Sequence, residues 1–211
     1  MLHQFTFNPF AENTYVMVDA AKKEALLFDP GCYGARECSQ LAQWFEQENI
    51  TPVRLLLTHA HIDHILGNAF VFEKYGLQPW LHPEDLPNLE RLVAYAPVFG
   101  LHAEASPEPA GWLAHGETIV FGGKEIELRH APGHSAGSIC FVNHTDRYVI
   151  GGDVLFAGSI GRTDLPGGHL QTLLTAVQEQ LFTLPDDYTV YPGHGEATTI
   201  GDEKRYNPFF Q

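Results

Sequence analysis

The sequence predicts an α/β fold in which helices pack outside sheets, and three observations support this prediction. Short apolar runs that end in turn residues recur along the chain, and longer amphipathic stretches separate them. Two comparable halves repeat this arrangement, which favours layered sheets covered by helices. The 211 residues are 44% hydrophobic and 18% charged, which excludes whole-chain disorder and suits a single domain over residues 1–211.

Strands are predicted in the first half wherever a short apolar run precedes turn residues. These predicted strands are Leu2–Phe7, Tyr15–Val18, Ala25–Phe28, Val53–Leu57 and Trp80–Leu81. Helices are predicted where apolar residues recur at helical spacing, over Ala35–Asn49, Asn68–Tyr75 and Pro83–Ala96. The Pro- and Gly-containing stretch 97–111 predicts a long loop, either on the substrate side or a plain connection.

The second half repeats the pattern. Its predicted strands are Thr118–Phe121, Lys124–Arg129, Ser138–Val142, Tyr148–Ile150 and Thr189–Tyr191. One helix is predicted over Leu170–Phe182, because Leu173, Val177 and Leu181 fall on one face.

Composition narrows the classes of partner. Lys and Arg total 12 against 26 Asp and Glu, so the net charge of -14 argues against nucleic acid as a partner. No apolar run approaches a membrane span, and the first residues lack the pattern of a signal peptide. Three sparse cysteines, Cys32, Cys38 and Cys140, suit a reducing compartment. We therefore expect a cytoplasmic protein with no membrane partner and a small-molecule substrate; the sequence leaves its oligomeric state open.

Four potential metal ligands fall within six residues: His59, His61, Asp63 and His64. At this composition the pattern His-x-His-x-Asp-His is expected by chance roughly 0.002 times in a chain of this length. In an extended segment, residues two apart point the same way, so His59 and His61 can share one ion. Asp63 and His64 follow a turn and can face a second ion.

Three further potential ligands follow predicted strands in Gly-containing turns. They are His134 in Pro-Gly-His, Asp153 in Gly-Gly-Asp and His194 in Pro-Gly-His-Gly. Open α/β sheets bind ligands beyond the carboxyl ends of their strands, so these turns are candidates to complete the site. The sequence therefore predicts a metal centre, with two ions as the favoured number.

These motifs, in this order, resemble the metallo-β-lactamase-fold hydrolases over essentially the whole chain, and Asp29-Pro30-Gly31 resembles the superfamily's first motif. The resemblance implies an αββα sandwich of two mixed sheets flanked by helices, with the metals at one edge. It also implies that His59, His61 and His134 hold one divalent ion, and that Asp63, His64 and His194 hold the other. Asp153 would bridge them. Zinc is the expected metal, with iron or manganese as alternatives.

Within the superfamily the chain looks most like a short glyoxalase II-like protein, that is, a hydroxyacylglutathione hydrolase-like protein. The stretch Gly161-Arg162-Thr163-Asp164 and the ending Asn207-Pro208-Phe209 carry this likeness. Full-length glyoxalase II enzymes have a helical C-terminal region that supplies much of the glutathione pocket, whereas only 17 residues follow His194 here (211 minus 194). The resemblance therefore says more about the metal chemistry of this chain than about its substrate.

The expected reaction is hydrolysis of a thioester such as S-lactoylglutathione by a metal-bridging hydroxide. Asp63 is the expected catalytic residue because it would bind the second metal and help orient the hydroxide. A thiolate leaves without a dedicated acid, since the pKa of its thiol is about 8.5, and the sequence shows no acid placed to protonate an amine. Around the ligands, Asp29 is expected to hydrogen-bond near the ligand loop, and Arg162 and Asp164 to pair and brace the loop after Asp153.

The same motifs also resemble the persulfide dioxygenases, which share the fold and use one iron ion. In that alternative His59, His134 and Asp153 would be the ligands, and the reaction would be an oxidation. Imidazole ligands suit zinc and iron alike, so the ligand types leave both readings open.

Overall fold

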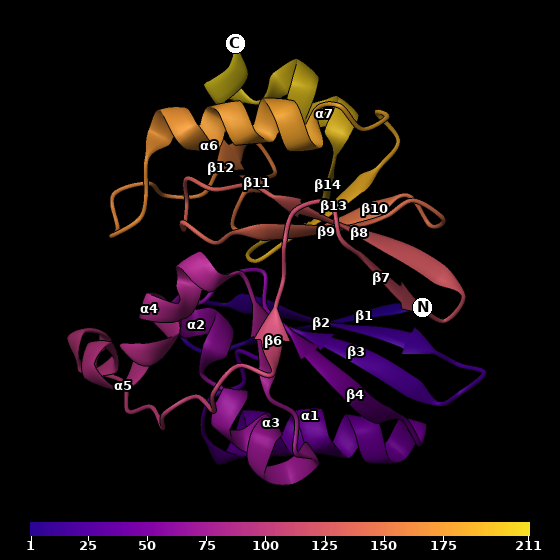
Figure 1. Cartoon of the computed structure of the whole chain (residues 1–211), viewed down its shortest axis with the longest axis vertical. Helices are drawn as coiled ribbons and strands as arrows, with labels where there is room; N and C mark the ends of the chain where they lie inside the picture. The colour runs from indigo at the N-terminus through magenta and orange to yellow at the C-terminus, as the bar shows by residue number, and fades with distance from the viewer. The chain divides into compact units, whose positions relative to one another are not determined.

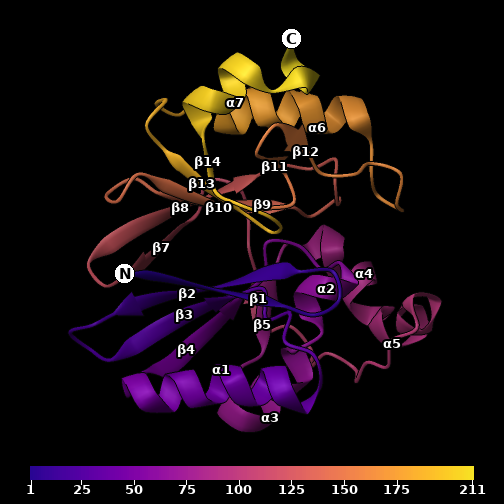
Figure 2. The ribbon, with the colours of Figure 1, turned by 180° about the vertical axis from the view of Figure 1, so that it is seen from behind.

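The computed structural model describes all residues, 1–211, and divides into two compact units. Unit 1 comprises Met1–Leu81 and Leu86–Trp112, and unit 2 comprises His82–Asp85 and Leu113–Gln211. Each unit is built on its own six-stranded mixed sheet with helices against it, as Figures 1 and 2 show for each unit in turn. No helix of the structure is both long enough and apolar enough to span a bilayer.

The sheet of unit 1 follows chain order from β1 to β6. Its strands are β1(Leu2–Phe7), β2(Glu12–Asp19), β3(Glu24–Phe28), β4(Thr51–Leu56), β5(Pro79–Leu81) and β6(Gly111–Trp112). The first three strands pair antiparallel, and β3 to β6 pair parallel. Since β3 and β4 are parallel neighbours, Phe28 lies opposite Leu56, and the segments that follow both strands start side by side.

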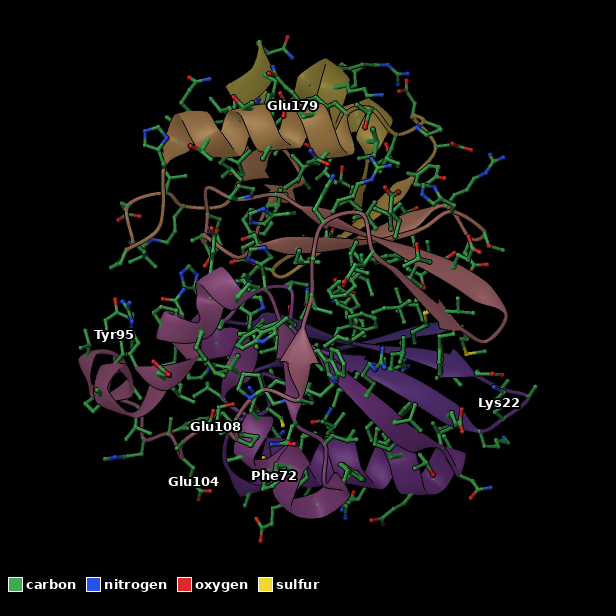
Figure 3. All side chains as sticks on the ribbon, viewed as in Figure 1. Lys22, Phe72, Tyr95, Glu104, Glu108 and Glu179 are labelled. Atoms are coloured by element: carbon green, nitrogen blue, oxygen red, sulfur yellow. The ribbon has the colours of Figure 1, made fainter.

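Two helices cover one face of this sheet, α1(Gly34–Glu48) and α3(Asn68–Tyr75) (Figures 1 and 2). The amphipathic pattern explains α1, because Leu41, Ala42 and Phe45 are buried on one side of it. It ends at Asn49, which takes the left-handed conformation that closes many helices. On α3, Val71 is buried and Phe72 points outward, 45% exposed (Figure 3).

The segment 83–96 is not the single helix that the sequence predicts. It contains the 3₁₀ turn η1(Pro83–Asp85), then α4(Leu86–Glu90) and α5(Leu92–Tyr95), and a further 3₁₀ turn, η2(Ala96–Phe99), follows. Pro87 has no amide hydrogen to donate to residue 83, and the Asp85 side chain bonds elsewhere. These two features prevent a regular helix from starting at residue 83. The turn η2 takes up the first residues of the predicted loop 97–111, so that loop is shorter than expected.

The sheet of unit 2 has the order β14-β13-β10-β9-β8-β7. Its strands are β7(Thr118–Phe121), β8(Lys124–His130), β9(Ile139–Asn143), β10(Tyr148–Gly152), β13(Thr189–Pro192) and β14(Thr198–Thr199), and a separate pair is formed by β11(Leu155–Phe156) and β12(Ser159–Ile160). Only β10 and β13 pair parallel, so Asp153 and Gly193, which follow them, leave the sheet at the same edge.

Two helical segments cover one face of this second sheet (Figures 1 and 2). They are α6(Leu170–Ala176), continued by the π-helical turn η3(Val177–Leu181), and α7(Ile200–Tyr206), which a short 3₁₀ turn, η4(Pro208–Phe210), follows. Leu173, Val177 and Leu181 are fully buried, as the helical spacing predicts. The predicted fold class is confirmed: two mixed sheets flanked by helices.

Candidate metal centre

Unit 1 carries four of the predicted ligands on one short segment after β4. His59 and His61 lie in the extended chain between β4 and the single-turn helix α2(Ile62–Ile65), which contains Asp63 and His64. The ring centroid of His59 lies 4.7 Å from that of His61 and 4.1 Å from that of His64. Nε2 of His64 lies 3.7 Å from Oδ2 of Asp63. The change from extended chain to helix therefore brings the four side chains close together. Residue spacing alone predicted this closeness only for His59 and His61.

Asp29 orients the buried His64 ring. The loop after β3 places the Asp29 carboxylate beside this ring, with Oδ2 3.0 Å from Nδ1 of His64. Asp29 is 1% exposed and His64 is fully buried. A carboxylate accepts this bond only from a protonated Nδ1, so Nε2 keeps the lone pair that a metal needs.

A hydroxyl relay orients His59 in the same way. The Thr58 hydroxyl donates its one hydrogen to Oδ2 of Asp29 at 2.5 Å, so at 3.1 Å from Nδ1 of His59 it accepts. The Thr58 amide also donates to Oδ1 of Asp29 at 2.7 Å. One carboxylate thus fixes the ligand-competent tautomer of two histidines.

Two residues that the sequence analysis did not single out, Asn8 and Glu12, support this segment from behind. The Asn8 amide donates to the carbonyls of Gly31 and Asp63, both at 2.9 Å, and so ties the two loops together. A Cβ on Gly31 would overlap the Glu12 carboxyl and lie 2.6 Å from the Asp63 carbonyl, so only glycine fits there. The contacts span up to 55 residues, and no local pattern marks them.

Glu12 lies fully buried behind the ligand segment. Its Oε1 is 3.9 Å from Nδ1 of His64, and its Oε2 accepts the Thr14 hydroxyl at 2.9 Å. Burial raises the pKa of Glu12 well above its usual range, and the nearby carboxylates of Asp29 and Asp63 raise it further, whereas His64 lowers it. This raised pKa lessens the negative charge that Glu12 adds beside Asp29 and Asp63.

Unit 2 carries the other three predicted ligands at the edge where β8, β10 and β13 end. Oδ2 of Asp153 lies 3.5 Å from Nε2 of His134 and 3.5 Å from Nε2 of His194. The Gly193 amide donates to the Gly152 carbonyl at 2.8 Å, which holds the two turns together. One carboxylate oxygen between two imidazole nitrogens is the arrangement expected of a bridging ligand.

The backbone of the next loop fixes the tautomer of His134. Nδ1 of His134 donates to the Arg162 carbonyl at 2.8 Å, so Nε2, which faces Asp153, keeps its lone pair. The Arg162 guanidinium forms a two-point ion pair with Asp164, at 2.8 and 2.7 Å. This hydrogen-bonded pair lowers the pKa of the exposed Asp164 to about 2. The Arg162 side chain is thus bonded within its own loop, while its carbonyl orients the histidine.

Substitution Gly161→Ala is expected to disturb this arrangement. The new Cβ would overlap the Asp153 carbonyl oxygen and lie 2.8 Å from Nδ1 of His134, so the loop must move. Overpacking of this kind costs about 1–3 kcal/mol of unfolding free energy. Thermal unfolding and bound-metal content measure the effect, and both should fall.

The matched control is Gly151→Ala, whose Cβ would meet Val190 at an ordinary 3.5 Å. Equal melting temperatures and metal contents for the two variants would contradict the role assigned to Gly161.

Asp85 supports the His134 loop, and the sequence analysis missed it. It lies in η1, fully buried, and its Oδ1 accepts the Ser135 hydroxyl and the Gly137 amide, the latter at 2.9 Å. Fifty residues separate Asp85 from Ser135. The only available signal was an acid in the first turn of the predicted helix 83–96, a position that many exposed residues share.

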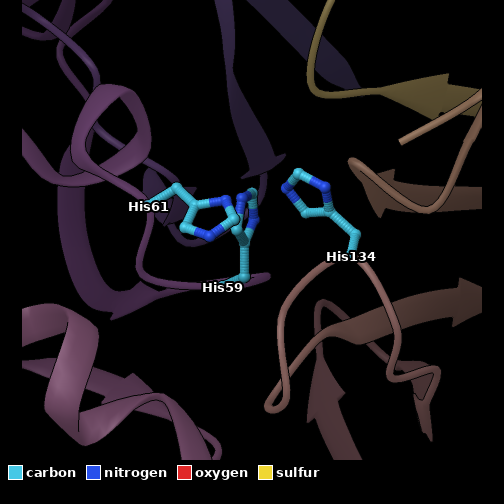
Figure 4. A group of neighbouring side chains, drawn as sticks. All are labelled: His59, His61 and His134. Carbon is cyan, nitrogen blue, oxygen red and sulfur yellow. The ribbon is translucent and has the colours of Figure 1, made fainter. Parts of the chain in front are cut away.

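The donor set fits divalent transition metals. The predicted ligands offer only imidazole and carboxylate groups, and the residues around them fix the metal-binding nitrogen of His59, His64 and His134. His59 and His61 extend from unit 1 after β4, and His134 extends from unit 2 after β8 (Figure 4). Within unit 1, Asp29, His59 and His64 also offer ligand atoms within 4.8 Å of one another. Each unit thus presents its own share of a metal-binding set.

Comparison with known proteins identifies the family. The family model of the metallo-beta-lactamase superfamily matches residues 7–194. A relative in Haemophilus influenzae, named hydroxyacylglutathione hydrolase GloC, is 37% identical over 202 residues, which covers 95% of this chain and 93% of that protein.

Three solved structures are similar over nearly the whole chain. A B3 metallo-beta-lactamase, BLEG-1, is 34% identical with a TM-score of 0.90, covering 100% of this chain and 99% of its own. TTHA1623 in a di-iron-bound form is 37% identical with a TM-score of 0.87, at 98% and 99% coverage. ETHE1 from Myxococcus xanthus is 25% identical with a TM-score of 0.79, at 99% and 83% coverage.

Proposed function

The chain belongs to the metallo-β-lactamase superfamily, and from this premise we propose that it is a metal-dependent hydrolase that cleaves a thioester such as S-lactoylglutathione. The observation that carries the proposal is the arrangement around Asp153, whose single carboxylate oxygen lies 3.5 Å from Nε2 of both His134 and His194. Two imidazole nitrogens close to one carboxylate oxygen favour two ions sharing a ligand.

We propose that both units contribute to this centre within one domain over residues 1–211. One ion would be held by His59, His61 and His134 and the other by Asp63, His64 and His194, with Asp153 as a ligand of both. Zinc is the proposed metal because its ligand preferences match this set, with iron or manganese as the alternatives. When bound, such ions supply a Lewis acid and lower the pKa of a water molecule toward neutrality.

The chain's own residues hold and orient the reacting groups. The Asp63 side chain is 13% exposed, and its Oδ2 lies 3.7 Å from the fixed His64 ring, so it is placed to accept a proton from a water molecule and to orient that water. Asp29 and the Arg162 carbonyl keep His64 and His134 in the tautomers that leave Nε2 unprotonated. Arg162 and Asp164 bond to each other, which supports the expected bracing role rather than a substrate contact.

The choice of a thioester rests on leaving-group chemistry and on one relative. A thiolate leaves unprotonated near neutral pH, since the pKa of its thiol is about 8.5, so the site needs no separate acid. The name of the Haemophilus influenzae relative supports a hydroxyacylglutathione as the substrate. The three free cysteines support a reducing, cytoplasmic setting, where glutathione is the main thiol.

An assay of S-lactoylglutathione hydrolysis, paired with elemental analysis of the purified protein, tests the proposal. We expect at least two metal ions per chain, thiol release without oxygen uptake, and loss of turnover after chelation that returns on addition of zinc. Hydrolysis that persists in the fully metal-free protein would overturn it.

A second candidate function is left open by two of the structural neighbours, one named ETHE1 and one that was solved with iron, although as a pair of ions. It is the persulfide dioxygenase reaction, with one iron ion on His59, His134 and Asp153. One iron per chain, together with oxygen uptake on glutathione persulfide and no thioester cleavage, would establish it in place of the hydrolase.

A further inference from the structure

A cluster of two histidines and a glutamate lies in unit 2, apart from the ligands proposed above. His82 follows β5, Glu84 lies in η1, and His130 ends β8. Their ligand atoms all lie within 4.8 Å of one another. We propose that His82, Glu84 and His130 form an additional, half-exposed site for one transition-metal ion, with Zn²⁺ as the best-matched ion.

The nitrogen of His130 that faces Glu84 is Nε2. It lies 3.8 Å from Oε2 of Glu84 and donates to the Ala136 carbonyl at 2.8 Å. An ion held between Nε2 and Glu84 would therefore replace this hydrogen bond, and the ring proton would move to Nδ1. Until an ion binds, the bond to Ala136 keeps Nε2 beside Glu84.

The other two donors are held close to His130. The rings of His82 and His130 stack with centroids 4.1 Å apart and planes 12° apart, and Oε2 of Glu84 lies 3.8 Å from Nε2 of His130. Asp85, next to Glu84, is anchored by its bonds to Ser135 and Gly137. The turn that carries His82 and Glu84 is thus fixed to the loop beyond β8.

Binding an ion requires a small movement of side chains. Tetrahedral zinc with bonds of about 2.0–2.1 Å sets neighbouring donors about 3.4 Å apart, so the three atoms close by about 1.4 Å at most. The His82 ring must also turn out of the stack. Its Nδ1 accepts only a long bond, 3.4 Å, from the Glu84 amide, so this turn breaks little.

The chemistry of the three donors selects the ion. Glu84 brings a carboxylate to the two imidazoles of His82 and His130. Two imidazoles and one carboxylate suit Zn²⁺ or Cu²⁺ rather than Ca²⁺ or Mg²⁺, which prefer oxygen ligands alone.

An ion at this site would join η1 to the end of β8. His134 follows His130 by four residues, and the same turn already bonds to Ser135 and Gly137. The ion would therefore stiffen the loop that presents His134, while leaving the set of ligands proposed for the main centre unchanged.

Equilibrium dialysis of the full chain against micromolar Zn²⁺, followed by elemental analysis, tests this proposal. The wild-type chain should hold one more equivalent of zinc than His82→Ala or His130→Ala. Glu84→Gln should lower the affinity for that additional zinc ion about tenfold or more. Glu84 is exposed, so its variant is expected to fold even where loss of a histidine disturbs packing.

Matched controls are His102→Ala and Glu108→Gln, both at exposed positions of unit 1 (Figure 3 labels Glu108). These should keep the wild-type stoichiometry. Equal zinc content in the wild type and in all three cluster variants would overturn the proposal. The test compares the zinc content of variants with that of the wild type. Its result therefore does not depend on whether the main centre takes one ion or two, or on which reaction that centre performs.

Discussion

Substitution Asp63→Asn is expected to lower kcat for S-lactoylglutathione about a thousandfold. The amide keeps the size of the side chain but accepts no proton and is a weaker metal ligand, so it removes both roles proposed for this carboxylate. Loss of a positioned base costs about 10²–10⁴ in rate. Steady-state kinetics should show the loss in kcat rather than in KM, because the substrate contacts remain.

Two measurements make this result interpretable. Circular dichroism should show an unchanged fold, because the Asp63 side chain is partly exposed and packs in a single-turn helix. Asp187→Asn is the matched control: it removes an exposed carboxylate paired with Arg147, and should leave kcat within about threefold. A wild-type kcat in Asp63→Asn with zinc bound would contradict the proposed role.

The predicted ligands could be read from sequence because of where they lie on the chain. Four occupy one short segment, and His134, Asp153 and His194 follow predicted strands in Gly-containing turns. Strand ends are positions that periodicity identifies, since side-chain alternation stops there. The same reasoning placed Leu2–Phe7, Asn68–Tyr75 and Thr118–Phe121 with their exact bounds.

The supporting residues could not be read in this way. Asn8, Glu12 and Asp85 act through contacts with partners about 50 residues away, and their own neighbourhoods carry no motif. Tertiary contacts also override local propensity, as in the predicted helix 83–96. Short strands such as β6 and β14 have two residues each, too few for a period to appear.

Asp29 is the position where substitution is expected to do the most damage inside unit 1. In Asp29→Ala the Thr58 amide, the Thr58 hydroxyl and Nδ1 of His64 lose their acceptor in a fully buried setting. Leaving such groups without a partner costs about 3–5 kcal/mol. Asp29 also has a φ of 47°, which alanine adopts less readily than aspartate. We expect a fall in melting temperature of about 10 °C, measured by calorimetry on the metal-free chain.

Asp29→Asn separates this stability effect from control of the histidine tautomer. Asparagine tolerates the same backbone conformation and can still accept the Thr58 amide, so the melting temperature should fall by only a few degrees. Its NH₂ group, however, would face Nδ1 of His64, which must then accept a hydrogen bond and move its proton to Nε2. A protonated Nε2 binds no metal, so zinc affinity should drop about 10–100-fold.

The two variants together decide what Asp29 does. If Asp29 only fills a buried turn, the asparagine variant should bind zinc like the wild type, and the alanine variant should lose affinity only as far as it unfolds. If Asp29 sets the tautomer of His64, the asparagine variant should be nearly as stable as the wild type and still lose zinc. Competition with a zinc-binding dye at a temperature where both variants are folded distinguishes these outcomes, because the difference then reflects the proton on Nε2 and not the folded fraction.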